Sequence, residues 1–243
     1  GAWIAIRKKR YDLVINAIHH SSSGKISTQF ANGKFKFLGE VNDEIRAAKP
    51  DYHHMAKMPV YSFRYFLNLL AIKSADAPVP PLSLKLKQSE LEQGKQLLRK
   101  LINNDKATIG IYTYATGTKC YPPSWWTEFY WLLKERFPEH NILEVLPIEN
   151  LSQISFKAPS FYSKNLREIA SLISNMTVFI AADSGMMHLA SASGTPVIGL
   201  FKSENISQYA PYNDRSVGVH TDRVTRSEIA LLVKTLTIPV APH

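Results

Sequence analysis

The 243-residue sequence has a single cysteine, Cys120, so it cannot form an intrachain disulfide framework or a zinc site of several cysteines. A reducing compartment suits such a chain. No apolar run approaches the ~20 residues that span a membrane. Internal repeats and low-complexity tracts are also absent. What remains is a globular chain, long enough for one large or two medium domains.

Acidic residues are in the minority, with 20 Asp and Glu against 29 Lys and Arg, which gives a net charge of +9. This excess favours an anionic partner, such as a nucleic acid, a phosphate-bearing small molecule or an anionic membrane surface. Simple solubility is the alternative that composition leaves open. The sequence contains no recognised nucleic-acid-binding motif, so we expect no nucleic-acid partner.

The most informative stretch is TVFIAADSGMMHLASASGTPVIGLF. Its pattern predicts a buried parallel strand, a tight loop, a helix and a second strand, over residues 177–181, 182–185, 186–193 and 197–201. Asp183 and Ser184 suit the N-cap of the helix, and Gly194 suits the position just after its end. A helix that begins at the carboxyl end of a parallel strand directs free N–H groups into the crevice there, which favours phosphate.

Two further residues of this stretch suit a ligand site. Gly185 lets a ligand approach the backbone closely. His188 lies four residues after Ser184, about one turn along the same side of the helix, where its imidazole would add a donor to a bound phosphate. The alternative is a plain βαβ crossover with a capped helix, which needs neither of these two residues.

The stretch resembles the donor-site signature of the family 9 glycosyltransferases, the ADP-heptose:lipopolysaccharide heptosyltransferases. The matching positions, in order, are Asp183, Ser184, Gly185, His188, Ala190, Ala192, Gly194 and Pro196. The resemblance implies a GT-B-like α/β fold, in which two Rossmann-like domains with parallel sheets face a cleft. It also implies an ADP-sugar donor and no cofactor or metal.

Periodicity predicts the remaining elements. We expect helices over 60–73, 88–102 with Ser89 as N-cap, 124–137, 165–175 and 225–236, and strands over 11–16, 35–41, 107–113, 142–147 and 217–220. The βα alternation from 107 to 236 indicates a doubly wound parallel sheet, with its ligand crevice at the carboxyl ends of the strands.

A proline-rich segment, SADAPVPP, predicts a linker over residues 74–81. We therefore expect a partial N-terminal, acceptor-side domain over residues 1–81 and a donor-binding domain over residues 82–243. By resemblance, the chain begins inside its first domain, with a truncated, disordered or naturally short front. The family's proposed general base, an aspartate in an early loop, then has no counterpart, and the catalytic residue is unknown.

The loop after the strand at 107–113 is the second part of the expected donor site. Lys119 takes the position of the family lysine that pairs with the donor phosphates, and Thr116, Gly117 and Thr118 would assist it. Tyr121 replaces the usual tryptophan. A solvated loop lysine is the alternative. Glu149 would bind the ribose, although the family's Gly-Gly turn is missing there and the following helix is lost or shortened.

On the acceptor side, the resemblance implies a polar loop that faces the cleft over residues 19–25, with Ser22 and Lys25 as acceptor contacts. A solvated loop is the alternative. The paired His19 and His20 do not make a metal site without further ligands, and the spacing of a P-loop is absent. His19, His20 and Asp12 are the nearby groups with the chemistry of a replacement base, and the sequence favours none of them.

These features predict a metal-independent inverting glycosyltransferase, which moves a heptose or similar sugar from an ADP-sugar to a lipopolysaccharide-core or related glycan. The expected partners are the nucleotide-sugar donor and an anionic glycolipid or glycan acceptor. The expected location is cytoplasmic, with peripheral association at the inner face of the bacterial inner membrane. The alternatives are a non-catalytic nucleotide-sugar-binding relative and another GT-B enzyme, such as a nucleotide-sugar epimerase.

Overall fold

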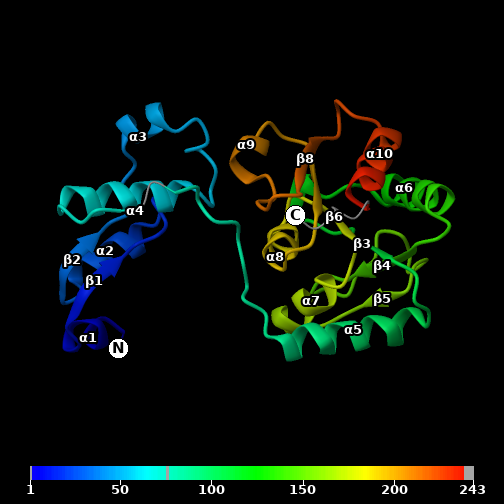
Figure 1. Cartoon of the computed structure of the whole chain (residues 1–243), viewed down its shortest axis with the longest axis horizontal. Coiled ribbons are helices and arrows are strands. Elements are labelled where there is room, and N and C mark those ends of the chain that lie inside the picture. Colours follow the sequence, from blue (N-terminus) through cyan, green and yellow to red (C-terminus); the bar gives the residue numbers. More distant parts are fainter. Residues whose placement is uncertain (1, 75–76, 238–243) are drawn as a thin grey trace. The chain divides into compact units, whose positions relative to one another are not determined.

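The computed structural model describes residues 2–74 and 77–237, and the chain divides into two compact units, residues 1–80 and 81–243. Helices and strands alternate along much of the chain (Figure 1). The α-helices are α1 Ala2–Lys8, α2 Ser22–Phe30, α3 Asp43–Ala48, α4 Met58–Leu69, α5 Gln88–Ile102, α6 Pro123–Arg136, α7 Leu166–Ile173, α8 Gly185–Ala192, α9 Ile206–Tyr209 and α10 Arg226–Thr237. The strands are β1 Tyr11–Ile15, β2 Gly33–Phe37, β3 Thr108–Tyr112, β4 Asn141–Val145, β5 Ser160–Phe161, β6 Val178–Ala182, β7 Val197–Phe201 and β8 Val217–His220, and a 3₁₀ turn covers Gly117–Lys119.

The first unit contains a parallel pair of strands, β1 and β2, joined by α2. Phe37 at the end of β2 is buried against two rings of α4, Phe63 and Phe66, with ring centroids 5.5 and 5.4 Å away. The buried Asn16, just after β1, donates from its side-chain amide to the carbonyl of Leu38, just after β2. This bond ties the carboxyl ends of the two strands together.

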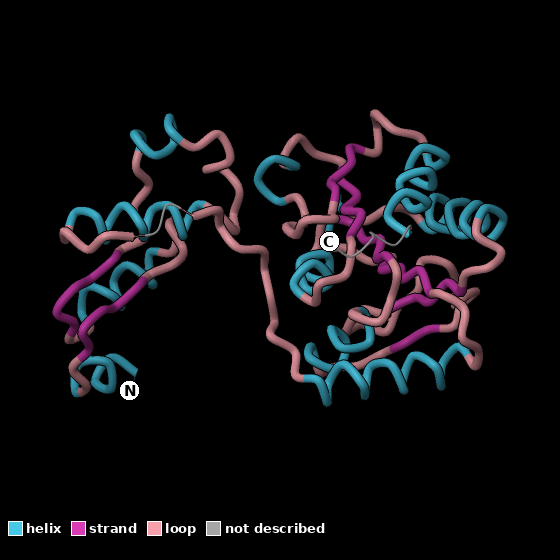
Figure 2. The backbone as a smooth tube through the Cα atoms, viewed as in Figure 1, coloured by secondary structure: helices cyan, strands magenta, loops and turns pink. Residues whose placement is uncertain are grey.

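The second unit is built on a six-stranded sheet with the order β5-β4-β3-β6-β7-β8, in which every neighbouring pair is parallel. Figure 2 shows the strands in magenta between cyan helices. β3, β4 and β5 follow one another toward one edge, and β6, β7 and β8 toward the other. The winding direction therefore reverses between β3 and β6. In open α/β sheets, ligands bind at the carboxyl ends of the strands on either side of such a reversal.

Helices cover both faces of this sheet (Figure 1). Each face has its own hydrophobic core. On one face, α6 and α10 bury Trp126, Phe129 and Ile229. On the other face, α5, α7 and α8 bury Leu98, Leu172 and Met187 among their apolar side chains. The strands β3, β6 and β7 are buried along their whole length, which explains their nearly continuous apolar sequences. None of the described helices has the length and apolarity needed to cross a bilayer.

The structure differs from the sequence-based expectations mainly in the first unit. The predicted polar loop over residues 19–25 is wrong in its second half, because α2 begins at Ser22 after the Ser21 hydroxyl accepts the N–H of Gly24 at 3.0 Å. The strand predicted at 35–41 lies at 33–37, and the helix predicted at 60–73 ends at Leu69. The predicted linker 74–81 includes residues 75–76, which lie outside the described part of the chain.

In the second unit, the predicted elements lie within two residues of the observed ones at almost every boundary. The expected N-cap of α5 is wrong, because the cap residue is Lys87 and Ser89 lies in the first turn. The carboxylate of Glu90, three residues after the cap, accepts the backbone N–H of Lys87 at 2.7 Å. The short helix α9 was not predicted.

Candidate active site at the β3–β6 switch point

The two loops that the sequence analysis paired lie side by side at the switch point. β3 and β6 are hydrogen-bonded neighbours, with Tyr112 opposite Ala181, so their carboxyl ends meet. The loop after β3 leads through the 3₁₀ turn to Lys119, and the loop after β6 is Asp183 and Ser184. The sheet topology thus brings together residues that are more than 60 positions apart in the sequence.

An ion pair joins these loops directly. Nζ of Lys119 lies 2.6 Å from a carboxylate oxygen of Asp183. The Asp183 side chain is only 8% exposed, whereas that of Lys119 is 49% exposed. The aspartate therefore acts as a buried anchor that holds a half-exposed ammonium at the mouth of the crevice. The Lys119 Nζ also lies 5.8 Å from the ring centroid of Tyr209, at the end of α9.

The N-terminus of α8 faces the same crevice. Ser184 is the N-cap, as predicted, and its hydroxyl accepts the N–H of Met187 at 3.4 Å. The remaining first-turn amides have no acceptor within the helix, so they and the helix dipole provide a partial positive charge. A Cβ built on Gly185 meets no atom within 4 Å, so the first turn opens onto free space. His188 lies one turn further along and is half-buried.

A pocket of about 420 Å³ adjoins this N-terminus and extends along the ends of β3 and β4. Four of the predicted donor-site residues line it, Thr116, Glu149, Ser184 and Gly185, whereas Lys119, Asp183 and His188 lie outside its lining. Ile148 and Leu166 also line it, although they are 69% and 60% exposed. Apolar side chains left exposed around a pocket with a few polar groups are typical of a small-molecule site.

Tyr112 is a polar group of this pocket that the sequence analysis did not identify. Burial raises the pKa of its hydroxyl to about 12, and the negative charge of Glu149 adds to the shift. Like an ordinary tyrosine hydroxyl, it is protonated at neutral pH and able to donate a hydrogen bond. Glu149 is exposed and at the pocket wall, where its carboxylate suits a ligand hydroxyl.

The pocket has further walls that sequence reasoning missed. They include Tyr114, Leu146, Pro147, Ser163, Lys164, Met186 and Leu189. Their positions in the sequence could have indicated them, because each follows a parallel strand, precedes α7 or lies in the first turns of α8. Sequence periodicity alone does not indicate which of these side chains turn toward the crevice.

The remaining predicted residues lie at the edge of the site or in the other unit. Gly117 and Thr118 form the exposed 3₁₀ turn beside Lys119, and Gly117 has a φ of +61°, which suits glycine. Ser22 and Lys25 lie in the first turn of α2 in the first unit, exposed and half-buried respectively. Their expected role toward the acceptor stays a prediction.

Part of the C-terminal unit is similar in sequence to known glycosyltransferases. Residues 163–230 match the family model described as glycosyltransferase family 9 (heptosyltransferase). The lipopolysaccharide core heptosyltransferase OpsX of Haemophilus influenzae is 39% identical over 64 residues. This match covers 26% of the chain but only 18% of OpsX, less than a fifth of that relative.

Solved structures resemble the chain over nearly its whole length. A family 9 glycosyltransferase from Veillonella parvula matches with a TM-score of 0.71 and 15% identity, over 93% of this chain and 73% of the other. The E. coli heptosyltransferase WaaC with ADP matches with a TM-score of 0.64 and 14% identity, over 96% of this chain and 75% of the other. The E. coli ADP-heptose lipopolysaccharide heptosyltransferase II matches with a TM-score of 0.63 and 13% identity, over 97% of this chain and 79% of the other. These likenesses confirm the predicted GT-B fold class. Residues 163–230 are thus similar to glycosyltransferase family 9, and the chain as a whole shares its fold with solved members of that family.

Proposed function

We propose that the chain belongs to a metal-independent, inverting glycosyltransferase that moves a heptose from an ADP-sugar to a lipopolysaccharide-core acceptor. The observation that carries the proposal is the Lys119–Asp183 pair at the N-terminus of α8, beside the 420 Å³ pocket. It is supported by the similar proteins, whose names refer to heptosyltransferases of the lipopolysaccharide core and, in one structure, to bound ADP.

In this proposal the donor lies along the carboxyl edge of the sheet. The nucleoside occupies the pocket, with the base against Ile148 and Leu166 and the ribose hydroxyls near Glu149. The diphosphate meets the first-turn amides of α8 and the ammonium of Lys119. His188 adds a donor from the next turn. Asp183, which is mostly buried, chiefly positions Lys119, and its proposed contact to sugar hydroxyls is secondary.

The reaction is a displacement at the anomeric carbon of the sugar. An acceptor oxygen forms the new glycosidic bond as the bond to the β-phosphate breaks, and ADP leaves with the electron pair. The acceptor proton passes to a base, which we do not assign. Negative charge grows on the β-phosphate, where Lys119 and the α8 amides stabilise it. Such preorganised donors are each worth about 3 kcal/mol of the barrier, and in our proposal they replace a metal ion.

The proposal also includes an acceptor and a cellular location. An anionic glycolipid or glycan suits the net charge of +9. Ser22 and Lys25, in the first turn of α2, are the proposed acceptor contacts. We propose a cytoplasmic location with peripheral attachment to the inner face of the inner membrane, where such a glycolipid is exposed.

Calorimetry and a product assay test the proposal together. We expect ADP to bind more tightly than UDP or GDP, and Lys119→Ala or His188→Ala to weaken ADP by at least tenfold. ADP-heptose incubated with a heptose-deficient lipopolysaccharide acceptor should then yield ADP and the heptosylated glycan. Binding without transfer in the full-length protein would favour a non-catalytic relative, and a sugar product without acceptor would favour an epimerase. If neither variant weakens any nucleotide, the site assignment is wrong.

A further inference from the structure

A second lysine, Lys202, lies close to the 3₁₀ turn of the donor site. It follows β7 directly, and β7 is the neighbour of β6 in the sheet. Its Nζ donates to the carbonyl of Cys120 at 2.7 Å and lies 4.5 Å from the ring centroid of Tyr121. Cys120 is the residue next to Lys119, so the two ammonium groups flank the same short turn.

The position of the Lys202 ammonium is well defined although the residue is exposed. The Tyr121 ring beneath it is 3% exposed, and the Tyr121 hydroxyl hydrogen-bonds Thr221 at 2.8 Å. Burial raises the pKa of the Tyr121 hydroxyl to about 12, and the charges of Asp222 and Asp183 add to the shift, so the hydroxyl is a neutral partner of Thr221.

The charges of the two lysines are balanced differently. Lys119 is in contact with the buried carboxylate of Asp183, which offsets its charge. Lys202 contacts a neutral carbonyl and an aromatic ring, and within residues 2–74 and 77–237 no carboxylate lies within 4.0 Å of its Nζ. An ammonium has three donors, so two remain for a ligand. Lys202 is therefore a cation whose charge no nearby carboxylate in the described part of the chain offsets.

The order of strands places the pocket and Lys202 on opposite sides of the Lys119–Asp183 pair. The nucleoside pocket lies over β4 and β3, the Lys119–Asp183 pair over β3 and β6, and Lys202 at the end of β7. Resting on the proposed function, we propose that Lys202 binds the terminal phosphate of the nucleoside diphosphate. It thereby provides the net positive charge that discriminates a diphosphate from a monophosphate.

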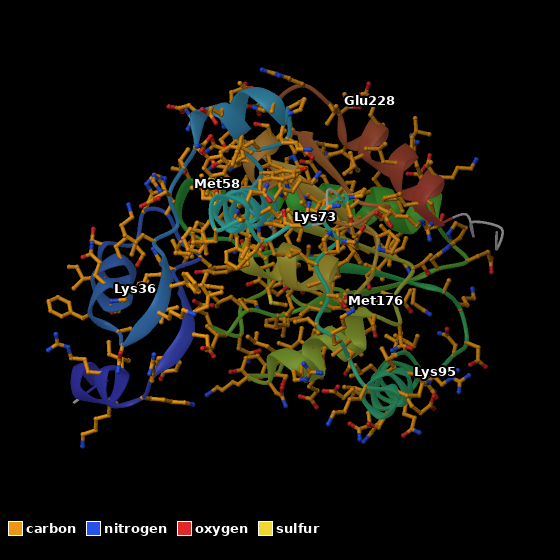
Figure 3. The ribbon with its side chains drawn as sticks, turned by 60° about the vertical axis from the view of Figure 1, so that its left-hand side comes forward. Lys36, Met58, Lys73, Lys95, Met176 and Glu228 are labelled. Carbon is orange, nitrogen blue, oxygen red and sulfur yellow. The ribbon has the colours of Figure 1, made fainter. Side chains whose placement is uncertain are left out.

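The test compares ADP and AMP affinities of the whole chain by calorimetry. Lys202→Met should raise the Kd for ADP by about 10- to 100-fold, the loss of one charge-assisted hydrogen bond, and change the Kd for AMP by less than about threefold. Lys202→Arg should stay within about threefold of the wild type for both, because a guanidinium keeps the positive charge and also donates charge-assisted hydrogen bonds to phosphate. The matched control is Lys95→Met, on the exposed side of α5 (Figure 3), which should change neither.

A merely structural role for Lys202, holding the turn at Cys120, would give another pattern. It would weaken AMP and ADP alike, and Lys202→Met would add nothing once Lys119 is also replaced by methionine. We expect a further loss of at least tenfold in ADP affinity in that double variant. An unchanged ADP affinity in Lys202→Met beside a weakened Lys119→Met would overturn this inference alone. A wild-type chain that binds neither nucleotide would overturn the proposed function with it.

Discussion

At the scale of single residues, we expect a side chain at Gly185 to affect folding and ligand binding in opposite directions. It is the first residue of α8, and a Cβ built on it meets nothing within 4 Å. The fold thus has room for a side chain at this position. In the proposed site the diphosphate occupies this free space, because it must come close to the backbone N–H groups.

We therefore predict opposite effects of Gly185→Ala on stability and binding. The free energy of unfolding should rise by about 0.5 kcal/mol, because alanine restricts the unfolded chain. ADP affinity should fall by at least tenfold, because the methyl group occupies the phosphate position. Thermal unfolding and calorimetry measure the two effects.

The matched control lies at the other end of the same helix. Gly194 has a φ of +89°, so Gly194→Ala should lower the free energy of unfolding by ~1–2 kcal/mol and leave ADP affinity unchanged. Equal ADP affinity of Gly185→Ala and the wild type would argue against a ligand at this helix end.

Glu144 is a second residue with a defined physical role. It is fully buried in β4, and its two carboxylate oxygens accept hydrogen bonds of 2.6 Å from the hydroxyls of Thr113 and Ser152. Thr113 also accepts the backbone N–H of Gln153 at 3.2 Å. The network fixes the segment after β4 to the end of β3, beside the pocket.

The stability of this network should depend on pH. Burial raises the pKa of Glu144 above its ordinary value of 4.5, against the opposing effect of the two hydrogen bonds. Below pH 4.5 the group is protonated in both the folded and the unfolded state. As the pH rises through the higher pKa of the folded state, the folded state must hold a buried charge, so its stability falls.

Replacing Glu144 by glutamine removes this titration. We compare the free energies of unfolding of the wild type and of Glu144→Gln. As the pH rises above 4.5, we predict that the wild type loses stability relative to the variant. Glu144→Ala, which also loses both hydrogen bonds, should cost about 2–4 kcal/mol near pH 7. Denaturant unfolding between pH 4 and 8 measures both, and parallel curves for the wild type and Glu144→Gln would contradict the assignment.

The sequence predicted single residues well where one local rule decides them. Ser184 and Gly194 occupy the cap positions that helix-end chemistry favours. The prediction of Ser89 as the N-cap of α5 was wrong, because the helix begins two residues earlier, where the Glu90 carboxylate accepts the backbone N–H of Lys87. Tyr112 and Lys202 were missed because their importance depends on which strands are neighbours, which no local pattern contains.

At the scale of elements, α5 and α7 come close at one glycine. A Cβ built on Gly94 of α5 would lie 2.0 Å from the carbonyl oxygen of Ser171 in α7. Asn175, just after α7, donates to the carbonyl of Leu91 in α5 at 3.1 Å. This close packing closes one face of the sheet, on which α8 also lies.

Gly94→Ala should therefore be destabilising although alanine is the better helix former. We expect a loss of about 3 kcal/mol in the free energy of unfolding, since backbone atoms cannot move aside as a flexible side chain does. Lys95→Ala, the neighbouring residue on the exposed side of α5, should change it by less than ~0.5 kcal/mol (Figure 3). Similar midpoints for both variants in denaturant would refute this packing.

Elements were predicted best where hydrophobic periodicity is strong. The central strands β3, β6 and β7 are short, buried and largely apolar, and the loss of a helix between β4 and α7 is confirmed. The 19–25 segment was expected as a loop by analogy, but a serine cap starts α2 within it. Analogy supplied the expectation there, whereas the local cap chemistry determines the structure.

At the scale of the whole molecule, both cores of the second unit and every residue of the proposed donor site lie within residues 81–243. We predict that this unit alone folds cooperatively and binds ADP within about threefold of the whole chain. Sugar transfer should be lost, because the proposed acceptor contacts lie in the first unit. Circular dichroism, calorimetry and a transfer assay on the shortened protein measure these outcomes, and loss of ADP binding in a folded unit would contradict the division of roles.

The central claim is that a nucleoside diphosphate binds where β6 leads into α8, opposite the turn that carries Lys119. Amide NMR of the isotopically labelled chain, titrated with ADP, tests it most directly. We predict that the largest shift changes fall on the backbone N–H groups of residues 184–187 and 116–119, with smaller ones around Glu149. Changes centred instead on the open groove between α6 and the 221–227 segment, or no saturable change at all, would contradict the claim.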